Sequence, residues 1–154
     1  MIQVLFTILI TMQFVVVVLH DVMKIPGWTH GKQVRAALGR CKLWLGTAVN
    51  AVFPGLACGF AWYFWNRPKP PGVTNYWMIY CGVTLASAIV MWYVPYFFGA
   101  TEKVKKMYAE MYEGTRQILP PRGDNPRPNL LHICFHVLFA TTLVLSLILR
   151  LVGA

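Results

Sequence analysis

The chain consists mainly of four apolar blocks, each about as long as a helix that crosses a membrane. Such a helix needs roughly 20 apolar residues. The blocks cover residues 1–19, 43–65, 75–98 and 130–152. Because the interior of a bilayer offers no water to backbone polar groups, apolar blocks of this length fold as helices. The sequence therefore predicts a single all-α integral membrane domain over residues 1–154, with four transmembrane helices.

The composition supports this prediction and argues against nucleic acid as a partner. Hydrophobic residues make up 57% of the chain and charged residues 12%, whereas soluble proteins have about 25% charged residues. The net charge is +9, and a strongly basic chain can indicate nucleic-acid binding. Here the basic residues lie between the apolar blocks, which is typical of membrane topology signals. We therefore expect no nucleic-acid partner.

The distribution of Lys and Arg predicts the orientation. The first loop holds five of these residues and the third loop six, whereas the second loop holds two and the C-terminal end one. The positive-inside rule then places the first and third loops in the cytoplasm and both termini on the other side. The first block lacks the basic start and the cleavage site of a signal peptide, so we expect it to be retained. The expected location is a bacterial inner membrane.

A strongly amphipathic segment, residues 101–118, follows the third block. Its apolar residues recur at helical spacing and form one stripe, which predicts a cytoplasmic helix. The stripe consists of Val104, Met107, Tyr108, Met111, Tyr112 and Ile118. Basic residues in and after this segment suit anionic membrane lipids. The candidates for contact with lipid headgroups are Lys103, Lys105, Lys106, Arg122 and Arg127.

Two histidines stand at the start of the fourth block. His132 and His136 are four residues apart, so they lie on one face of a helix. His20 and Asp21 follow the first block on the same predicted side, and all four residues converge if the first and fourth helices are neighbours. Imidazole often binds transition metals, so His132 and His136 are candidate ligands for a metal or haem. The favoured role for these histidines is nevertheless structural, in hydrogen bonds or lipid contacts at a helix end, and a proton or substrate role is a further alternative.

The second block contains one strongly polar residue, Asn50, and a proline, Pro54. Asn50 either satisfies the carbonyl that Pro54 leaves without a donor or lines a pocket. Small residues at four-residue spacing allow helices to approach closely. They are Ala51, Gly55 and Gly59 in the second block and Gly82 and Ala86 in the third. We expect these two helices to pack together, with contact between copies or with another membrane protein as the alternative.

The sequence leaves two main classes of function open. The first is a non-catalytic membrane protein with a basic cytoplasmic face: a scaffold, an accessory subunit or a lipid-binding bundle. The second is a membrane enzyme, or a metal- or haem-binding protein, that acts on a lipid-soluble substrate through the histidines. The second and third blocks contain no carboxylate, which argues against an ion channel or a carboxylate proton relay. No metalloprotease or phosphate-loop motif identifies a cofactor.

Overall fold

The computed structural model describes every residue except 21, 24, 26, 29, 30, 153 and 154. Within this described part, four helices are long and apolar enough to cross a membrane. They are α1 (Ile2–Leu19), α3 (Arg40–Tyr63), the helix that runs from α4 (Pro71–Ala88) through the π-helical turn η1 (Ile89–Tyr93) into α5 (Val94–Phe98), and α7 (Leu130–Leu151). Shorter helices are α2 (Gly31–Leu38) and α6 (Glu102–Tyr112). The predicted all-α, four-span fold with a helix after the third span is confirmed.

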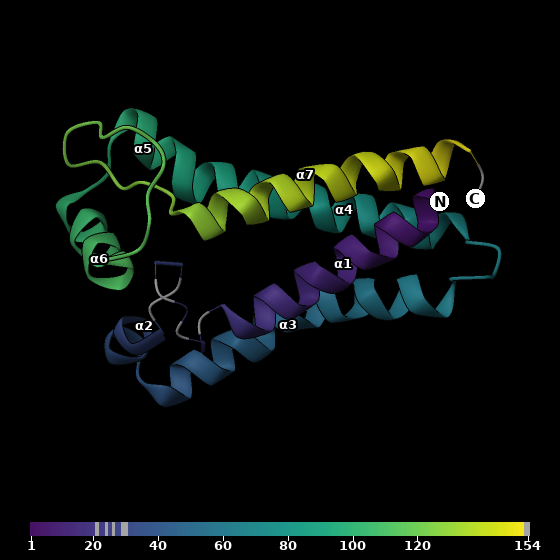
Figure 1. Ribbon diagram of the computed structural model, residues 1–154, viewed down its shortest axis with the longest axis horizontal. Helices are drawn as coiled ribbons and strands as arrows, with labels where there is room; N and C mark the ends of the chain where they lie inside the picture. The colour runs from purple at the N-terminus through teal and green to yellow at the C-terminus, as the bar shows by residue number, and fades with distance from the viewer. Residues whose placement is uncertain (21, 24, 26, 29–30, 153–154) are drawn as a thin grey trace.

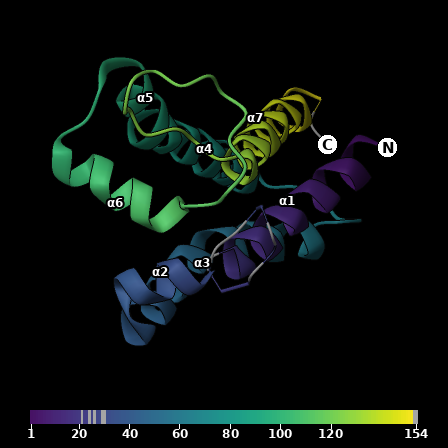
Figure 2. The same ribbon diagram turned by 60° about the vertical axis from the view of Figure 1, so that its left-hand side comes forward.

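The long helices form two antiparallel pairs. One pair is α1 with α3, the other is α4 with α7, and α1 also packs on α7. The pairs lie closest at the end that holds both termini and spread apart towards α2 and α6 (Figures 1 and 2). At that wider end α2 packs on α6, and the Arg116 amide donates a hydrogen bond to the Gly27 carbonyl, 2.7 Å away. The two basic segments therefore meet at one end of the bundle.

The hydrophobic core joins the two pairs towards the end with the termini. The rings of Phe6 and Trp77 are 4.5 Å apart, and the Trp77 indole N–H donates to the Ala57 carbonyl at 3.1 Å. The core comprises Phe6, Ile10, Ala57, Ala61, Trp77, Tyr80, Cys81, Phe139 and Leu149. Because most of these residues lie in the halves of the helices nearest the termini, the opposite halves are free to separate.

Two glutamines fasten α1 to the rest of the bundle. Gln13 is fully buried, and its amide donates to the Thr142 hydroxyl of α7 at 2.7 Å. At the start of α1, the Gln3 amide donates to the Trp65 carbonyl, and the Lys69 ammonium donates to Gln3 Oε1 at 3.0 Å. A polar group in a membrane interior needs such a partner because water is absent. These bonds hold α1 at its middle and at its start.

The helix after the third span is shorter than the predicted 101–118. It begins at Glu102 and ends at Tyr112. Thr101 caps its N-terminus, because the Thr101 hydroxyl oxygen accepts a hydrogen bond from the Val104 amide. Gly114 then adopts a left-handed backbone conformation with φ of 71°, which does not continue a helix. The Thr115 hydroxyl donates to the Tyr112 carbonyl at 2.7 Å. Residues 113–118 therefore belong to the following loop.

One small residue of the second span, Gly55, faces α1 and not the predicted third span. The main contact of α3 is with α1, and its contact with α4 is smaller. A Cβ atom added at Gly55 would lie 3.3 Å from Cε2 of Phe14 on α1, whereas Gly59 and Gly82 have no such neighbour within 4 Å. The close approach at Gly55 is thus between α1 and α3. A packing role for the others, Ala51, Gly59, Gly82 and Ala86, stays a prediction.

Replacing Gly55 with leucine is expected to destabilise the protein by about 1–3 kcal/mol, because an overpacked side chain forces its neighbours to move. The measurement is the midpoint of unfolding when detergent-solubilised protein is titrated with dodecyl sulfate. Gly59→Leu is the matched control, since that position is open. Equal effects of the two substitutions would contradict a tight contact at Gly55.

Candidate functional site

Three of the histidines meet near the wide end of the bundle. The ring centroids of His20 and His132 are 6.3 Å apart, and those of His132 and His136 are also 6.3 Å apart. The first histidine follows α1 and the other two belong to the first turns of α7. The structure thus brings together three residues that the sequence assigned to one site. Asp21 and His30 lie outside the described residues.

Asn129 orients His132. Its side-chain oxygen accepts hydrogen bonds from the His132 amide at 3.0 Å and from the His132 ring nitrogen Nδ1 at 2.7 Å. The first bond caps the N-terminus of α7. Because an amide oxygen only accepts, the second bond places the ring proton on Nδ1 and leaves the lone pair on Nε2. The sequence signal for this arrangement is an asparagine three residues before the histidine.

The other two rings are also held by neighbours. Nδ1 of His20 lies 2.9 Å from the Val17 carbonyl, so it is the protonated nitrogen of that ring. Nδ1 of His136 lies 3.1 Å from the Tyr93 hydroxyl. All three histidines therefore have defined orientations, and each has a structural reason for its position.

Aromatic side chains enclose His132. The Trp92 ring lies 4.1 Å from the His132 ring and the Tyr112 ring 5.3 Å from it. Trp92 also contacts Tyr108, with ring centroids 4.8 Å apart. The sequence predicts that the two tyrosines belong to an amphipathic stripe and gives no role to Trp92. It did not predict that they surround a histidine.

The π-helical turn and Pro95 determine where this aromatic wall stands. In an α-helix the Met91 carbonyl accepts a bond from the amide of residue 95, which a proline lacks. The hydroxyl of Tyr108 donates to the Met91 carbonyl instead, at 2.7 Å. The π turn ends two residues before Pro95 and includes the buried Trp92. This hydrogen bond and the contacts of the Trp92 ring with Tyr108 and Tyr112 hold α6 beside the histidines.

Two adjoining cavities lie between the helix pairs. The larger has a volume of about 540 Å³ and lies between α3 and α4, and the smaller, about 230 Å³, borders the three histidines. His20, Thr84 and Phe135 line both cavities. No Lys, Arg, Asp or Glu occurs among the described residues that line either one. The pair of cavities is thus a mainly apolar space with histidines at one end.

Polar side chains also line the larger cavity. Asn50 is exposed there, and its amide has no hydrogen-bond partner among the described residues. Tyr80 is 8% exposed, and its hydroxyl is likewise without a described partner. The Tyr76 hydroxyl donates to the Phe53 carbonyl at 2.9 Å. Asn50 thus lines a pocket, and the choice between the two roles that the sequence left open for it stays a prediction.

The described residues contain no group of three or more His, Cys, Asp or Glu side chains that could hold a metal ion. Zinc sites in proteins use three or four protein ligands. His132 and His136 supply two, and Nδ1 of His132 already bonds to Asn129. A metal at this pair therefore stays a prediction without further support from the geometry.

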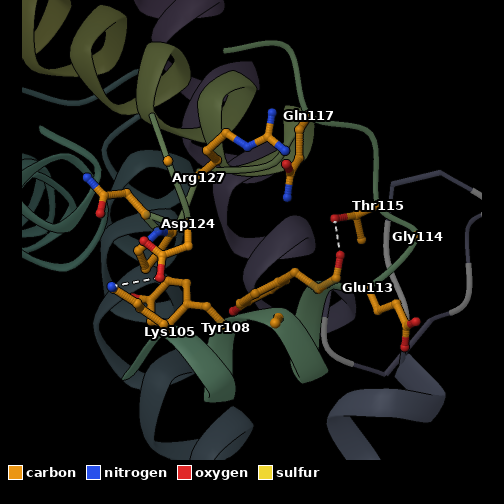
Figure 3. Close-up of a pocket in the computed structure, with 13 residues that line it drawn as sticks. Lys105, Tyr108, Glu113, Gly114, Thr115, Gln117, Asp124 and Arg127 are labelled. Carbon is orange, nitrogen blue, oxygen red and sulfur yellow. Dashed lines mark hydrogen bonds and ion pairs between the residues drawn. The ribbon is translucent and has the colours of Figure 1, made fainter. Parts of the chain in front are cut away.

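A third cavity, of about 330 Å³, lies outside the spans between α6 and the loop that follows it. Figure 3 shows Lys105 and Asp124 on one side of it and Arg127 and Gln117 on the other. The Lys105 ammonium lies 2.8 Å from Asp124 and 2.9 Å from Glu102. These hydrogen bonds raise the pKa of Lys105 and lower the pKa of Asp124. The pair fastens the loop to α6.

The five cations that the sequence assigned to lipid headgroups have different surroundings. Lys105 is held by two carboxylates, and the Arg127 guanidinium donates to the Leu119 carbonyl at 3.3 Å. Arg122 lies over the Phe97 ring, 4.8 Å from its centroid. The exposed members of the set are Lys103, Lys106 and Arg122. These three are the ones available to a membrane surface.

Comparisons with models of protein families, with curated proteins and with solved structures find no match to this chain. The interpretation of the site therefore depends on its geometry.

The loop after α6 is expected to open as the pH falls below about 4. Lys105 holds the pKa of Asp124 below its ordinary value of 3.8. A lowered carboxyl pKa stabilises the fold above the ordinary value, and this contribution is lost as the pH falls through the folded-state value. Lys105 titrates above 10.5, so it stays charged throughout this range.

Hydrogen exchange of residues 119–127 between about pH 3 and pH 6, corrected for the intrinsic rate, measures this opening. Asp124→Asn is expected to remove the pH dependence. Glu110→Gln is the control, because the Glu110 carboxylate lies 3.9 Å from Lys106 and both side chains are exposed. Wild-type protection that stays constant down to pH 3 would show that the pair does not hold the loop.

Proposed function

We propose that this protein is a non-catalytic membrane protein that binds a lipid-soluble ligand in the two adjoining cavities between its helix pairs. The end that carries α2 and α6 lies in the cytoplasm of a bacterial cell, and the exposed cations there contact anionic lipids. The protein acts by holding its ligand within the membrane, close to the histidines and within reach of a partner.

One observation carries this proposal: the shape and chemistry of the cavities. Ligand sites are mostly apolar hollows of about 300–1,000 Å³ with a few polar groups, and the larger cavity, at about 540 Å³, falls in this range. Its edge consists of exposed apolar residues of α3 and α4, including Val49, Ile79 and Val83. A lipid-soluble molecule can therefore enter sideways from the hydrocarbon of the membrane.

The orientation is supported by charge. The first and third loops contain most of the Lys and Arg residues of the chain, and cytoplasmic loops carry such an excess. Lys103 and Lys106 are exposed on α6, and Arg122 is exposed on the loop that follows. Each basic residue near an anionic membrane surface attracts it by about 1 kcal/mol.

A membrane enzyme is the second candidate, because His20, His132 and His136 all line the smaller cavity. A ligand that extends from the larger cavity reaches these rings. A non-catalytic function is preferred because hydrogen bonds to Asn129, Tyr93 and backbone carbonyls already account for the positions of the three histidine rings.

Replacing Thr84 with phenylalanine is expected to abolish ligand binding, because Thr84 lines both cavities and the larger ring fills the space between them. The measurement is native mass spectrometry, with organic extraction, of protein purified in mild detergent. The wild-type protein should carry a bound lipid. The Thr84→Phe variant should lose this lipid and should unfold at a midpoint similar to that of the wild type. Val144→Phe is the matched control, since Val144 is 56% exposed and lines neither cavity.

The outcomes of this experiment separate the two candidates. Loss of the lipid from Thr84→Phe alone supports the cavities as its site, and equal lipid content in all three proteins would overturn it. An enzyme would also convert added extract into a new species, and His132→Ala with His136→Ala would abolish the conversion. A non-catalytic protein leaves the extract unchanged.

The orientation predicts which loops react from outside the cell. In a variant without native cysteines, Asn66→Cys in the second loop should react with a membrane-impermeant maleimide in intact cells whose outer membrane has been made permeable. Glu110→Cys on α6 should react only after lysis of the inner membrane. The reverse pattern would place the basic end outside.

A further inference from the structure

The larger cavity holds two uncharged hydrogen-bond donors that no described residue engages. The Tyr80 hydroxyl is buried without a partner, and the Asn50 amide lines the same cavity. Asn50 is the eleventh residue of α3 and Tyr80 the tenth of α4. At a rise of 1.5 Å per residue, each lies about 15 Å from the start of its helix, near mid-membrane.

Other polar groups around this cavity are already used. The Tyr76 hydroxyl donates to the Phe53 carbonyl, and the Thr84 hydroxyl donates to the Tyr80 carbonyl at 2.8 Å. A donor without a partner is unfavourable in hydrocarbon, where no water replaces the missing bond. The two remaining donors therefore point to a ligand group that accepts hydrogen bonds.

The walls of the cavity restrict the charge of that group. Its described lining contains no Lys, Arg, Asp or Glu. His20 also lines this cavity, but it follows the end of α1, whereas Asn50 and Tyr80 lie near mid-membrane. A carboxylate or phosphate beside Asn50 and Tyr80 would therefore be a buried charge without an ion-pair partner, which is strongly unfavourable. An uncharged acceptor carries no such cost. A carbonyl oxygen has two lone pairs, so it can accept from both donors.

We infer that the ligand is a neutral lipid whose carbonyl oxygen accepts hydrogen bonds from the Tyr80 hydroxyl and the Asn50 amide. This inference rests on the proposed function and names the ligand class. The apolar part of the ligand lies along the exposed edge formed by Val49, Ile79 and Val83 and continues into the surrounding hydrocarbon. Ester lipids and lipid quinones share this chemistry.

Matched probes test the inference on the full chain in detergent micelles. They are methyl dodecanoate with a neutral carbonyl, tridecane without one, dodecanoate with a charge, and a decyl-substituted benzoquinone. The readout is the rise of the unfolding midpoint with probe concentration, since a ligand stabilises the folded state that binds it. The ester or the quinone should raise the midpoint at the lowest concentrations.

Two variants locate the hydrogen bonds. Tyr80→Phe and Asn50→Leu should each raise the apparent Kd of the carbonyl probe about 2- to 10-fold, which is the effect of losing one net hydrogen bond. The apparent Kd of tridecane should stay unchanged. Tyr63→Phe is the control, because Tyr63 is exposed and lines no part of this cavity. Thr84→Phe should abolish binding of every probe.

The results separate the inference from the proposed function. If tridecane binds as tightly as the ester and the quinone, or if Tyr80→Phe and Asn50→Leu change nothing, the carbonyl inference is overturned while lipid binding stands. If dodecanoate binds more tightly than the uncharged probes, the inference that the ligand is neutral is overturned. If no probe binds the wild type, or if binding survives Thr84→Phe, the proposed function fails as well. Tighter binding of the quinone or of the ester identifies the source of the carbonyl.

Discussion

The wide end of this protein depends on one missing backbone donor. Pro95 cannot offer an amide to the Met91 carbonyl, and the Tyr108 hydroxyl takes its place. In a membrane-spanning helix such a carbonyl needs a substitute donor, because no water is present. The substitute donor here comes from α6. The hydrogen bond that satisfies the Met91 carbonyl of the third span therefore also holds α6 against the end of that span. That docking brings Tyr112 against His132.

Hydrogen bonds inside the bundle are distributed unevenly, and this explains where the cavities lie. Gln13 ties α1 to α7, and the Gln3 amide ties the start of α1 to the loop after α3. Between α3 and α4 the contact is smaller, and it rests on side chains such as Tyr76. The helix pairs are therefore joined at one end and separate at the other, which leaves a hollow beside Asn50.

Part of the site follows from the sequence alone. Topology predicts that His20 and the fourth-span histidines lie at one end of the bundle. In the structure the ring centroids of His20 and His136 each lie 6.3 Å from that of His132. The role of Trp92 could not be predicted, since an aromatic residue near a span end has the same pattern whether it faces lipid or a histidine. Tyr80 lies near mid-membrane, where an aromatic side chain has the same pattern whether it faces lipid or a cavity. Gly55 was matched to the wrong neighbour, because small-residue spacing shows a close approach without identifying the partner helix.

The sequence by itself determined the class of the fold: the number of spans, their approximate limits and the loops that hold the charge. These properties depend on local hydropathy and length, which are written along the chain. Only the tertiary structure decided which helices pair, that α6 stops at Tyr112, and that Asn50 and Tyr80 line one cavity. Such contacts depend on which faces of distant helices meet. Lipid hydrocarbon is as apolar as the helix surfaces, so the pattern of apolar residues does not distinguish the packed face from the lipid face.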